Sequence, residues 1–331
     1  MLVDLAHGHG DLTQMLLTSW ITILRASVVV VFASCALIVG PQLVGFAQST
    51  TAPQQASPDD RYVLGPDSLP QPGVPEGKVS EFILADSKTY PGYTHKWWLY
   101  VPSQYDGNKP IALMVFQDGA QLRFVQRDGE WRVPVVLDNL IAKKELPVMA
   151  AVFIDPGQPI RPTGGPDAQR SYEYDTVGDR YAMFLITEIL PEVQRRVRIT
   201  DNPDGRGIAG RSSGGICAFT VAWHRPDQFR KVFSANGSFV NIRGGGAYPD
   251  IIRQSAPKPL RVFLQDGVND ELGGRFKGLN WPEGNRAMSA ALAMKGYDYQ
   301  LVMGEGTHSG RHGAALFPDA LRWLWRDYRA D

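Results

Sequence analysis

The residues best suited to chemistry lie between positions 207 and 215, which read Gly-Ile-Ala-Gly-Arg-Ser-Ser-Gly-Gly. Ser212 stands between Gly210 and Gly214 in the pattern Gly-x-Ser-x-Gly. An apolar run precedes this pattern and a helix-compatible run follows it, which predicts a strand, a sharp turn and a helix. In such a turn the glycines allow a close approach of backbone segments, and the serine hydroxyl is presented as a nucleophile. We therefore expect Ser212 to be a catalytic nucleophile.

A serine nucleophile needs a base that takes its proton. Three histidines follow Ser212 in the chain. His224 would end the helix that begins after the serine, about three turns away, so it cannot fold back to the hydroxyl. His308 stands in a glycine-rich loop after the last predicted strand, and His312 stands four residues later, near the start of the last helix. We expect His308 to be the base and His312 to lie in the loop or at the pocket rim.

The base in turn needs a carboxylate that orients its imidazole. The predicted strand 260–264 leads into three acidic residues, Asp266, Asp270 and Glu271. Asp270 follows the turn and can lean toward the histidine loop, so we favour it. Asp266 is the second choice because it stands directly at the strand end, where it could instead cap a turn. Glu271 is the third.

Ester or amide cleavage through a serine also needs donors for the negative oxygen of the intermediate. We expect the backbone amide of Ser213 to be one donor. The second should come from the loop after the early strand 111–117, where the amide of Ala120, or else that of Gly119, is the candidate.

Two aromatic residues are candidates for the substrate pocket, namely Trp281 after the acid loop and Phe239 after Asn-Gly-Ser. Core packing is the alternative for each. The remaining histidines, carboxylates and cysteine do not have metal-ligand spacing, so we predict neither a metal nor a cofactor.

Alternating strands and helices must position these residues. Strand-like runs are short and almost wholly apolar, as is typical of parallel strands buried on both faces. The pattern predicts an α/β fold with a mostly parallel central sheet, helices on both faces and an antiparallel first hairpin. The expected strands are 79–84, 95–101, 111–117, 148–154, 207–209, 231–235, 260–264 and 300–303, and the expected helices are 136–143, 179–197, 213–223, 285–295 and 314–328.

The composition limits the classes of partner. The 331 residues include 34 Lys+Arg and 34 Asp+Glu, so the formal net charge is zero and the pI is near 7.0. A balanced surface has no footprint for a nucleic-acid backbone. Hydrophobic residues at 44% and charged residues at 21% are typical of a globular domain. We expect one domain over residues 78–331, acting on a small-molecule or polymer-linked ester.

The N-terminal region predicts a targeting segment. Arg25 precedes an uncharged apolar run over 26–40, and small residues at Gly45 and Ala47 fit a cleavage site. We predict a signal peptide over 1–47, followed by a flexible polar lead over 48–77. The protein would then be exported to the periplasm or secreted, with no membrane partner beyond the leader. An uncleaved leader would instead anchor it in the membrane.

Several motifs together resemble the “putative esterase” family of α/β-hydrolases, which includes enterochelin, feruloyl and acetyl-xylan esterases and mycolyltransferases. The resemblance implies an α/β-hydrolase fold, the triad Ser212, Asp270 and His308, and a backbone oxyanion hole. It implies a serine carboxylic-ester hydrolase that works through an acyl-enzyme, and the predicted leader adds that this hydrolase is exported. An acyltransferase of the same fold and a non-catalytic binding protein on this scaffold are the alternatives. The motifs are Phe116-Gln-Asp-Gly119, Arg170-Ser-Tyr-Glu-Tyr174, Gly210-Arg-Ser-Ser-Gly-Gly215, Gly267-Val-Asn-Asp270 and Gly306-Thr-His308.

Overall fold

A computed structural model describes residues 56–120, 122, 124–160 and 166–329. The predicted leader over 1–47 and residues 48–55 of the predicted lead lie outside the described residues.

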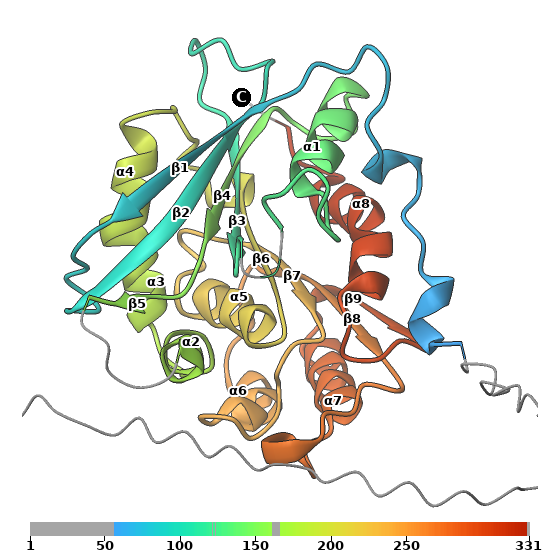
Figure 1. Cartoon of the computed structure of the whole chain (residues 1–331). Coiled ribbons are helices and arrows are strands. Elements are labelled where there is room, and N and C mark those ends of the chain that lie inside the picture. The colour runs from blue at the N-terminus through green and yellow to red at the C-terminus, as the bar shows by residue number, and fades with distance from the viewer. Residues whose placement is uncertain (1–55, 121, 123, 161–165, 330–331) are drawn as a thin grey trace, which may run out of the picture. The chain divides into compact units, whose positions relative to one another are not determined.

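The described residues form a nine-stranded sheet (Figure 1). Its strand order is β1-β2-β4-β3-β6-β7-β8-β9, with β5 paired to β2. The pairs β1–β2 and β2–β4 are antiparallel, and every pair from β4 to β9 is parallel. This confirms the predicted α/β fold with a mostly parallel sheet and an antiparallel first hairpin. The strands are β1 (Lys78–Leu84), β2 (Tyr93–Val101), β3 (Ala112–Gln117), β4 (Met149–Ile154), β5 (Gln158–Pro159), β6 (Arg206–Arg211), β7 (Lys231–Ala235), β8 (Arg261–Gly267) and β9 (Asp298–Gly304).

Burial on both faces explains why the central strands are apolar without alternation. Every residue of β3, β4 and β7 is buried. Along β3, Leu113 and Val115 belong to one core cluster, whereas Met114 and Phe116 belong to the other. Successive side chains of a strand point to opposite faces, so each face of the sheet has its own core. Because the central strands are parallel, their carboxyl ends meet at one edge of the sheet.

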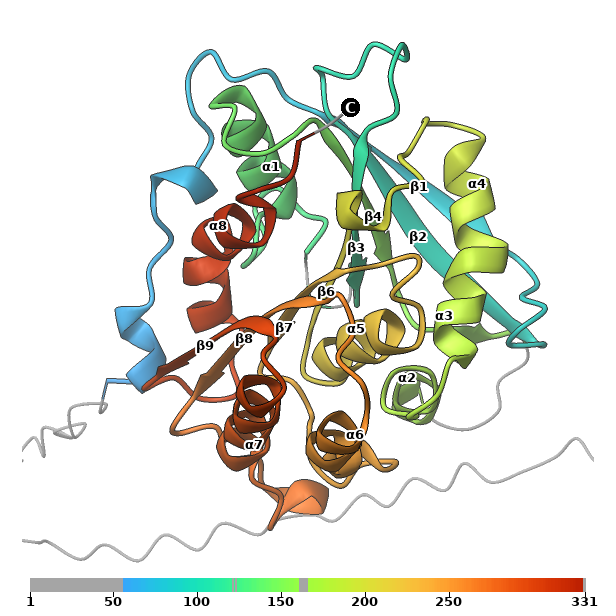
Figure 2. The same ribbon diagram turned by 180° about the vertical axis from the view of Figure 1, so that it is seen from behind.

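Helices cover both faces of the sheet (Figures 1 and 2). Helices α1 and α8 pack on one face, and α3, α5, α6 and α7 pack on the other. The helices are α1 (Val133–Ala142), α2 (Pro166–Tyr174), α3 (Arg180–Phe184), α4 (Leu190–Gln194), α5 (Ser213–His224), α6 (Tyr248–Gln254), α7 (Trp281–Met294) and α8 (Arg311–Trp325).

Three differences from the predicted helices have local causes. The single helix predicted over 179–197 is interrupted by a π-helical turn over Leu185–Ile189, which ends two residues before Pro191, a residue that lacks an amide donor. Helix α2 is short and strongly polar, and α6 is only seven residues long. Neither has a long apolar stripe, so periodicity did not reveal them.

The prediction of a flexible polar lead is wrong for residues 57–77, which pack against the rest of the described domain. Two short 3₁₀ helices form there, η1 (Pro58–Arg61) and η2 (Pro66–Ser68). The side-chain amide of Asn139 on α1 donates to the carbonyls of Asp67 (2.8 Å) and Leu69 (2.9 Å). The composition misled us because polar residues here serve as helix caps and turn residues. Ser57, for example, begins η1 with a capping box.

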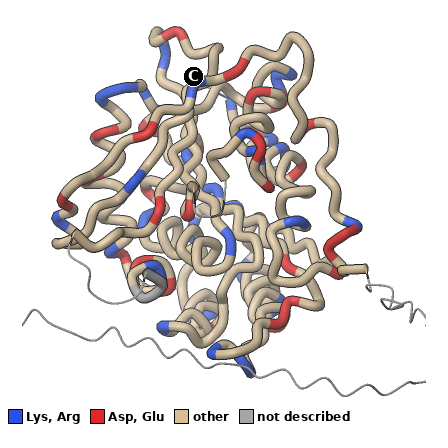
Figure 3. The backbone as a smooth tube through the Cα atoms, viewed as in Figure 1, with Lys and Arg blue, Asp and Glu red and all other residues tan. Residues whose placement is uncertain are grey.

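Three further observations concern the described residues only. Acidic and basic residues are mixed along this part of the chain (Figure 3). None of its helices is both long and apolar enough to span a bilayer. Its one cysteine, Cys217, is a buried free thiol in α5.

Candidate active site

Ser212 occupies a strained turn between β6 and α5. Its backbone has φ 58° and ψ −122°, a conformation that residues other than glycine rarely adopt. Gly210 permits this turn, since a Cβ there would lie 2.3 Å from the carbonyl oxygen of Gly214. The amide of Ser212 donates to the carbonyl of Ala235 on β7 (2.9 Å), which fixes the turn to the neighbouring strand. The serine thus stands at the carboxyl edge of the sheet, as its sequence motif predicts.

Two loops at the same edge bring a histidine and a carboxylate to this serine. His308, in the loop after β9, places its Nε2 2.8 Å from Ser212 Oγ. Its Nδ1 lies 2.7 and 2.9 Å from the two oxygens of Asp270, in the loop after β8. The structure therefore puts the three side chains in one hydrogen-bonded chain, although 96 positions separate Ser212 from His308.

Burial sets the charge of these groups. Burial lowers the pKa of His308 to about 4, so the imidazole is neutral near pH 7 and can accept a proton. The Asp270 carboxyl is fully buried, and it accepts a hydrogen bond from the Asn236 side-chain amide (2.9 Å). With Nδ1 facing a carboxylate, the ring proton belongs on Nδ1, which leaves Nε2 free to accept from the serine.

A second buried carboxyl, that of Asp266, lies behind Asp270. Its Oδ1 accepts from the amide of Gly267 (2.8 Å) and from Asn236 (3.1 Å), and its Oδ2 accepts from Asn285 (2.8 Å). Burial and the neighbouring Asp270 raise the pKa of Asp266 to about 8. Two adjacent carboxyls cannot both ionise easily, so Asp266 keeps the proton and Asp270 the charge.

The other acids and histidines of the sequence prediction lie elsewhere. Glu271 is exposed. His312 is buried, with Nδ1 2.9 Å from the side-chain amide of Gln265 and its ring stacked on Tyr62, rather than at a pocket rim. His224 ends α5.

The predicted oxyanion donors are only partly available. The amide of Ser213 is in the first turn of α5, where N–H groups have no partner within the helix, and it directly follows the nucleophile. The amide of Ala120, however, donates to Asp155 Oδ1 (3.0 Å), and that of Gly119 donates to the carbonyl of Ile154 (3.3 Å). Neither donor from this loop is free in the structure. The prediction missed this because the acceptors belong to β4 and its end, which sequence order does not place beside residues 119–120.

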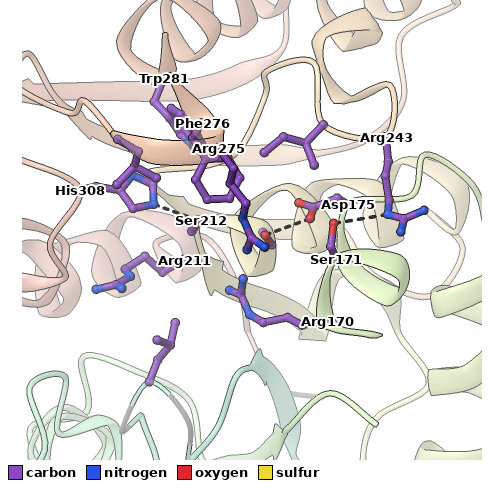
Figure 4. A pocket seen from close by; sticks show the side chains of 14 residues that line it. Arg170, Ser171, Asp175, Arg211, Ser212, Arg243, Arg275, Phe276, Trp281 and His308 are labelled. Carbon is purple, nitrogen blue, oxygen red and sulfur yellow. Dashed lines mark hydrogen bonds between the residues drawn. The ribbon is translucent and has the colours of Figure 1, made fainter. Parts of the chain in front are cut away.

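A cavity of about 530 Å³ opens beside Ser212 (Figure 4). Four arginine side chains surround it, and Trp281 and Phe276 form an aromatic wall. The ring of Trp281 meets the imidazole of His308 edge-on, with centroids 5.2 Å apart. The lining residues are Leu122, Arg170, Ser171, Asp175, Arg211, Ser212, Ser213, Ile242, Arg243, Leu272, Arg275, Phe276, Trp281 and His308.

Phe239 is not part of this lining, and its prediction as a pocket residue is wrong. It is 2% exposed and packs edge-on against Phe219 and Tyr248 in the core. The alternative of core packing holds for Phe239, whereas Trp281 is both buried and at the cavity wall.

Two of the arginines have different partners. Arg170 makes two hydrogen bonds to Asp118, at 2.7 and 2.6 Å, and so neutralises a buried carboxylate. Arg243 donates to a neutral group, the hydroxyl of Ser171 (3.3 Å), and its guanidinium lies over the ring of Tyr172. Glu173, on the same helix α2, contacts the buried His95 (3.1 Å).

Sequence reasoning missed several residues around the site. Asn236 bridges both buried carboxyls and has φ 47°, and Asn-Gly after a strand is a signal for such a left-handed turn. Ser238, two residues later, lies 3.4 Å from Ser212 Oγ and accepts from Trp281 Nε1 (3.1 Å). Asp59 contacts the histidine loop from the N-terminal segment, and no local sequence signal marks it.

Comparison with known proteins decides the family. A model of the family described as “Putative esterase” matches residues 89–324. The chain belongs to this esterase family. Membership confirms the resemblance seen in the motifs, and it confirms the prediction of an ester-hydrolysing enzyme at the level of the family.

Individual relatives of this esterase are distant. It is 28% identical over 213 residues to the iron(III) enterobactin esterase of Escherichia coli K12, a match that covers 61% of this chain and 48% of the relative. The chain thus matches about half the length of that relative. It is 23% identical over 248 residues to the uncharacterized protein YbbA of Bacillus subtilis, covering 71% of this chain and 94% of the relative.

Solved structures show the same fold. The enterochelin esterase of Shigella flexneri superposes with a TM-score of 0.62 at 24% identity, covering 78% of this chain and 60% of that one. A ferulic acid esterase of Anaeromyces mucronatus superposes with a TM-score of 0.61 at 17% identity, covering 77% and 93%. The α/β-hydrolase fold predicted from the sequence is therefore confirmed.

Proposed function

We propose that this esterase is an exported serine carboxylic-ester hydrolase, with Ser212 as nucleophile, His308 as general base and acid, and Asp270 as the orienting carboxylate. The observation that carries the proposal is the hydrogen-bonded chain from Ser212 Oγ through both nitrogens of His308 to Asp270. The strained backbone of Ser212 and the esterase family support the same conclusion. The export signal over residues 1–47 is the part of this proposal that rests on the sequence alone.

The reaction would proceed in two halves. Ser212 Oγ attacks the ester carbonyl carbon while its proton moves to His308 Nε2, and the carbonyl oxygen becomes negative. The amide of Ser213 stabilises this oxyanion. The intermediate then collapses, and His308 gives the proton to the departing alcohol. Water attacks the acyl-serine in the same way, and the carboxylic acid leaves.

Asp270 has two roles in this scheme. It holds the imidazole in the tautomer that has its proton on Nδ1, and it stabilises the imidazolium that forms when Nε2 takes the serine proton. Because the carboxyl is fully buried, water does not screen that interaction.

Loss of the nucleophile tests the proposal. Ser212→Ala should lower kcat for p-nitrophenyl acetate about 10⁴-fold or more, with an unchanged circular dichroism spectrum. Ser103→Ala, which changes an exposed serine, is the matched control and should retain wild-type turnover. Turnover by Ser212→Ala at the wild-type rate would refute the proposal.

A further inference from the structure

The loop that carries His308 has little stiffness of its own. It connects β9 to α8 and reads Gly304-Glu-Gly-Thr-His-Ser-Gly310. Three glycines in seven residues give the unfolded loop a large number of backbone conformations, all but one of which must be lost for His308 to face Ser212. Contacts from outside the loop must therefore hold it.

Those contacts come from the N-terminal segment 57–62, about 250 positions away in the sequence. Asp59, in η1, is 5% exposed. Its Oδ1 accepts from the backbone amide of Thr307 (3.0 Å), and its Oδ2 accepts from the Thr307 hydroxyl. Both hydrogen bonds act on the residue directly before His308. Figures 1 and 2 show this segment, in blue, beside β9 and the first turn of α8.

Tyr62 makes a second set of contacts with the same loop. Its hydroxyl accepts from the amide of Glu305 (2.7 Å), and its ring stacks on His312 with centroids 4.0 Å apart and an interplanar angle of 18°. His312 is fixed in turn by Gln265 on β8 (2.9 Å). The loop is thus held at both ends, before and after His308.

The loop glycines fit this segment closely. A Cβ on Gly304 would lie 2.3 Å from the Tyr62 hydroxyl and 2.3 Å from His312 Cε1. A Cβ on Gly306 would lie 3.0 Å from Asp59 Oδ1 and 3.2 Å from Tyr62 Cε2. Glycine at these positions is needed for the segment to approach the loop, so loop and segment are matched to each other.

Two exposed ion pairs flank these contacts, Arg61 with Glu305 and Asp60 with Arg311. All four side chains are more than half exposed, so water and salt weaken both pairs. The buried Asp59–Thr307 contact is therefore the one expected to control the loop.

We propose that segment 57–62 is part of the catalytic apparatus, with Asp59 as a positioning residue that holds His308 toward Ser212 through Thr307. The proposal rests on the function proposed above, since it assumes that His308 is the base. It makes residues 57–62, which composition alone would assign to a flexible lead, a requirement for catalysis.

Substitutions in the full chain test this role. Asp59→Ala should lower kcat for p-nitrophenyl acetate about 10- to 100-fold with little change in KM, because small displacements of a catalytic base have effects of that size. It should slow the reaction of Ser212 with a fluorophosphonate probe by a similar factor. Asp59→Asn keeps one acceptor oxygen for Thr307 and should recover part of the loss. Asp86→Ala removes an exposed carboxylate outside this segment and is the matched control, with an expected change below about twofold.

The outcomes separate this proposal from the proposed function. Wild-type kcat and labelling in a folded Asp59→Ala protein would overturn the positioning role alone. A folded wild-type protein that neither reacts with the probe nor hydrolyses esters would overturn both. If Asp59→Ala does not fold, Thr307→Val removes the hydroxyl contact and Tyr62→Phe removes the contact to the Glu305 amide. Each should then lower kcat at least threefold, and wild-type kcat in both would overturn the positioning role.

Discussion

Replacing Asp270 and Asp266 in turn by asparagine tests which of these two adjacent buried carboxyls orients His308. The sequence favoured Asp270 only from its place after the turn. In the structure both oxygens of Asp270 accept, one from His308 Nδ1 (2.7 Å) and one from Asn236 Nδ2 (2.9 Å). An asparagine has one acceptor oxygen, so it can satisfy only one of these donors. If the oxygen stays with Asn236, the new amide group faces Nδ1 and donates to it.

The result is the wrong tautomer of His308, with its proton on Nε2, where it donates to Ser212 instead of accepting from it. Loss of the base in this way is expected to lower kcat about 10³- to 10⁴-fold. Asp266→Asn should behave differently. His308 Nδ1 lies against Asp270 and not Asp266, and Asp266 holds a proton at neutral pH because burial and Asp270 raise its pKa to about 8, so an uncharged amide at 266 leaves the tautomer of His308 unchanged. We expect a loss of less than about tenfold.

The assay is kcat and KM for p-nitrophenyl acetate, with circular dichroism to check folding and Glu271→Gln as an exposed control. Glu271→Gln should match the wild type. Equal losses in Asp266→Asn and Asp270→Asn would refute the assignment of Asp270 as the orienting carboxylate. A loss below tenfold in Asp270→Asn would refute the tautomer argument.

Burial lowers the pKa of His308 to about 4, so kcat/KM should still be on its plateau at pH 5.5, and a midpoint near pH 6.5 would contradict this. Because the histidine pKa is higher in the unfolded chain than in the folded protein, the unfolded chain takes up this proton at a higher pH. His308 therefore contributes to the free energy of unfolding above pH 6.5, and this contribution is lost as the pH falls toward 4. Urea unfolding of the wild type and of His308→Gln can measure it. Because four arginines line the cavity and the exposed Arg243 donates to the neutral hydroxyl of Ser171, Arg243→Ala should raise KM about tenfold for an ester with an acyl-chain carboxylate and not for its neutral isostere. Burial also raises the pKa of the Cys217 thiol, so thiol reagents should modify Cys217 only in urea, and rapid modification of Cys217 in the native protein would contradict its burial in α5.

The sequence was informative where local patterns and chain order decide the structure. Short apolar runs predicted eight of the strands, because buried parallel strands need apolar side chains on both faces. The turn at Ser212 was predictable because its glycines and flanking elements are contiguous. His308 and Asp270 followed from their places after consecutive strands, since carboxyl ends of parallel strands share one edge. Their catalytic roles stay predictions.

The rest depended on contacts between distant segments. Composition alone made residues 57–77 look flexible, yet Asp59 is buried by a loop that lies almost at the other end of the chain. The sequence order gives no sign that the amide of Ala120 donates to Asp155, which follows a different strand. Phe239 and Trp281 were both candidates for the pocket, and only packing distinguishes a core ring from a pocket wall.

The most direct test of the central claim is to identify the residue that a fluorophosphonate modifies. The folded full-length protein is treated with a fluorophosphonate, digested and analysed by mass spectrometry. We predict a single modified peptide that contains Ser212, absent in Ser212→Ala and formed much more slowly in His308→Gln. An unmodified wild-type protein, or modification of another serine with Ser212 intact, would contradict the account.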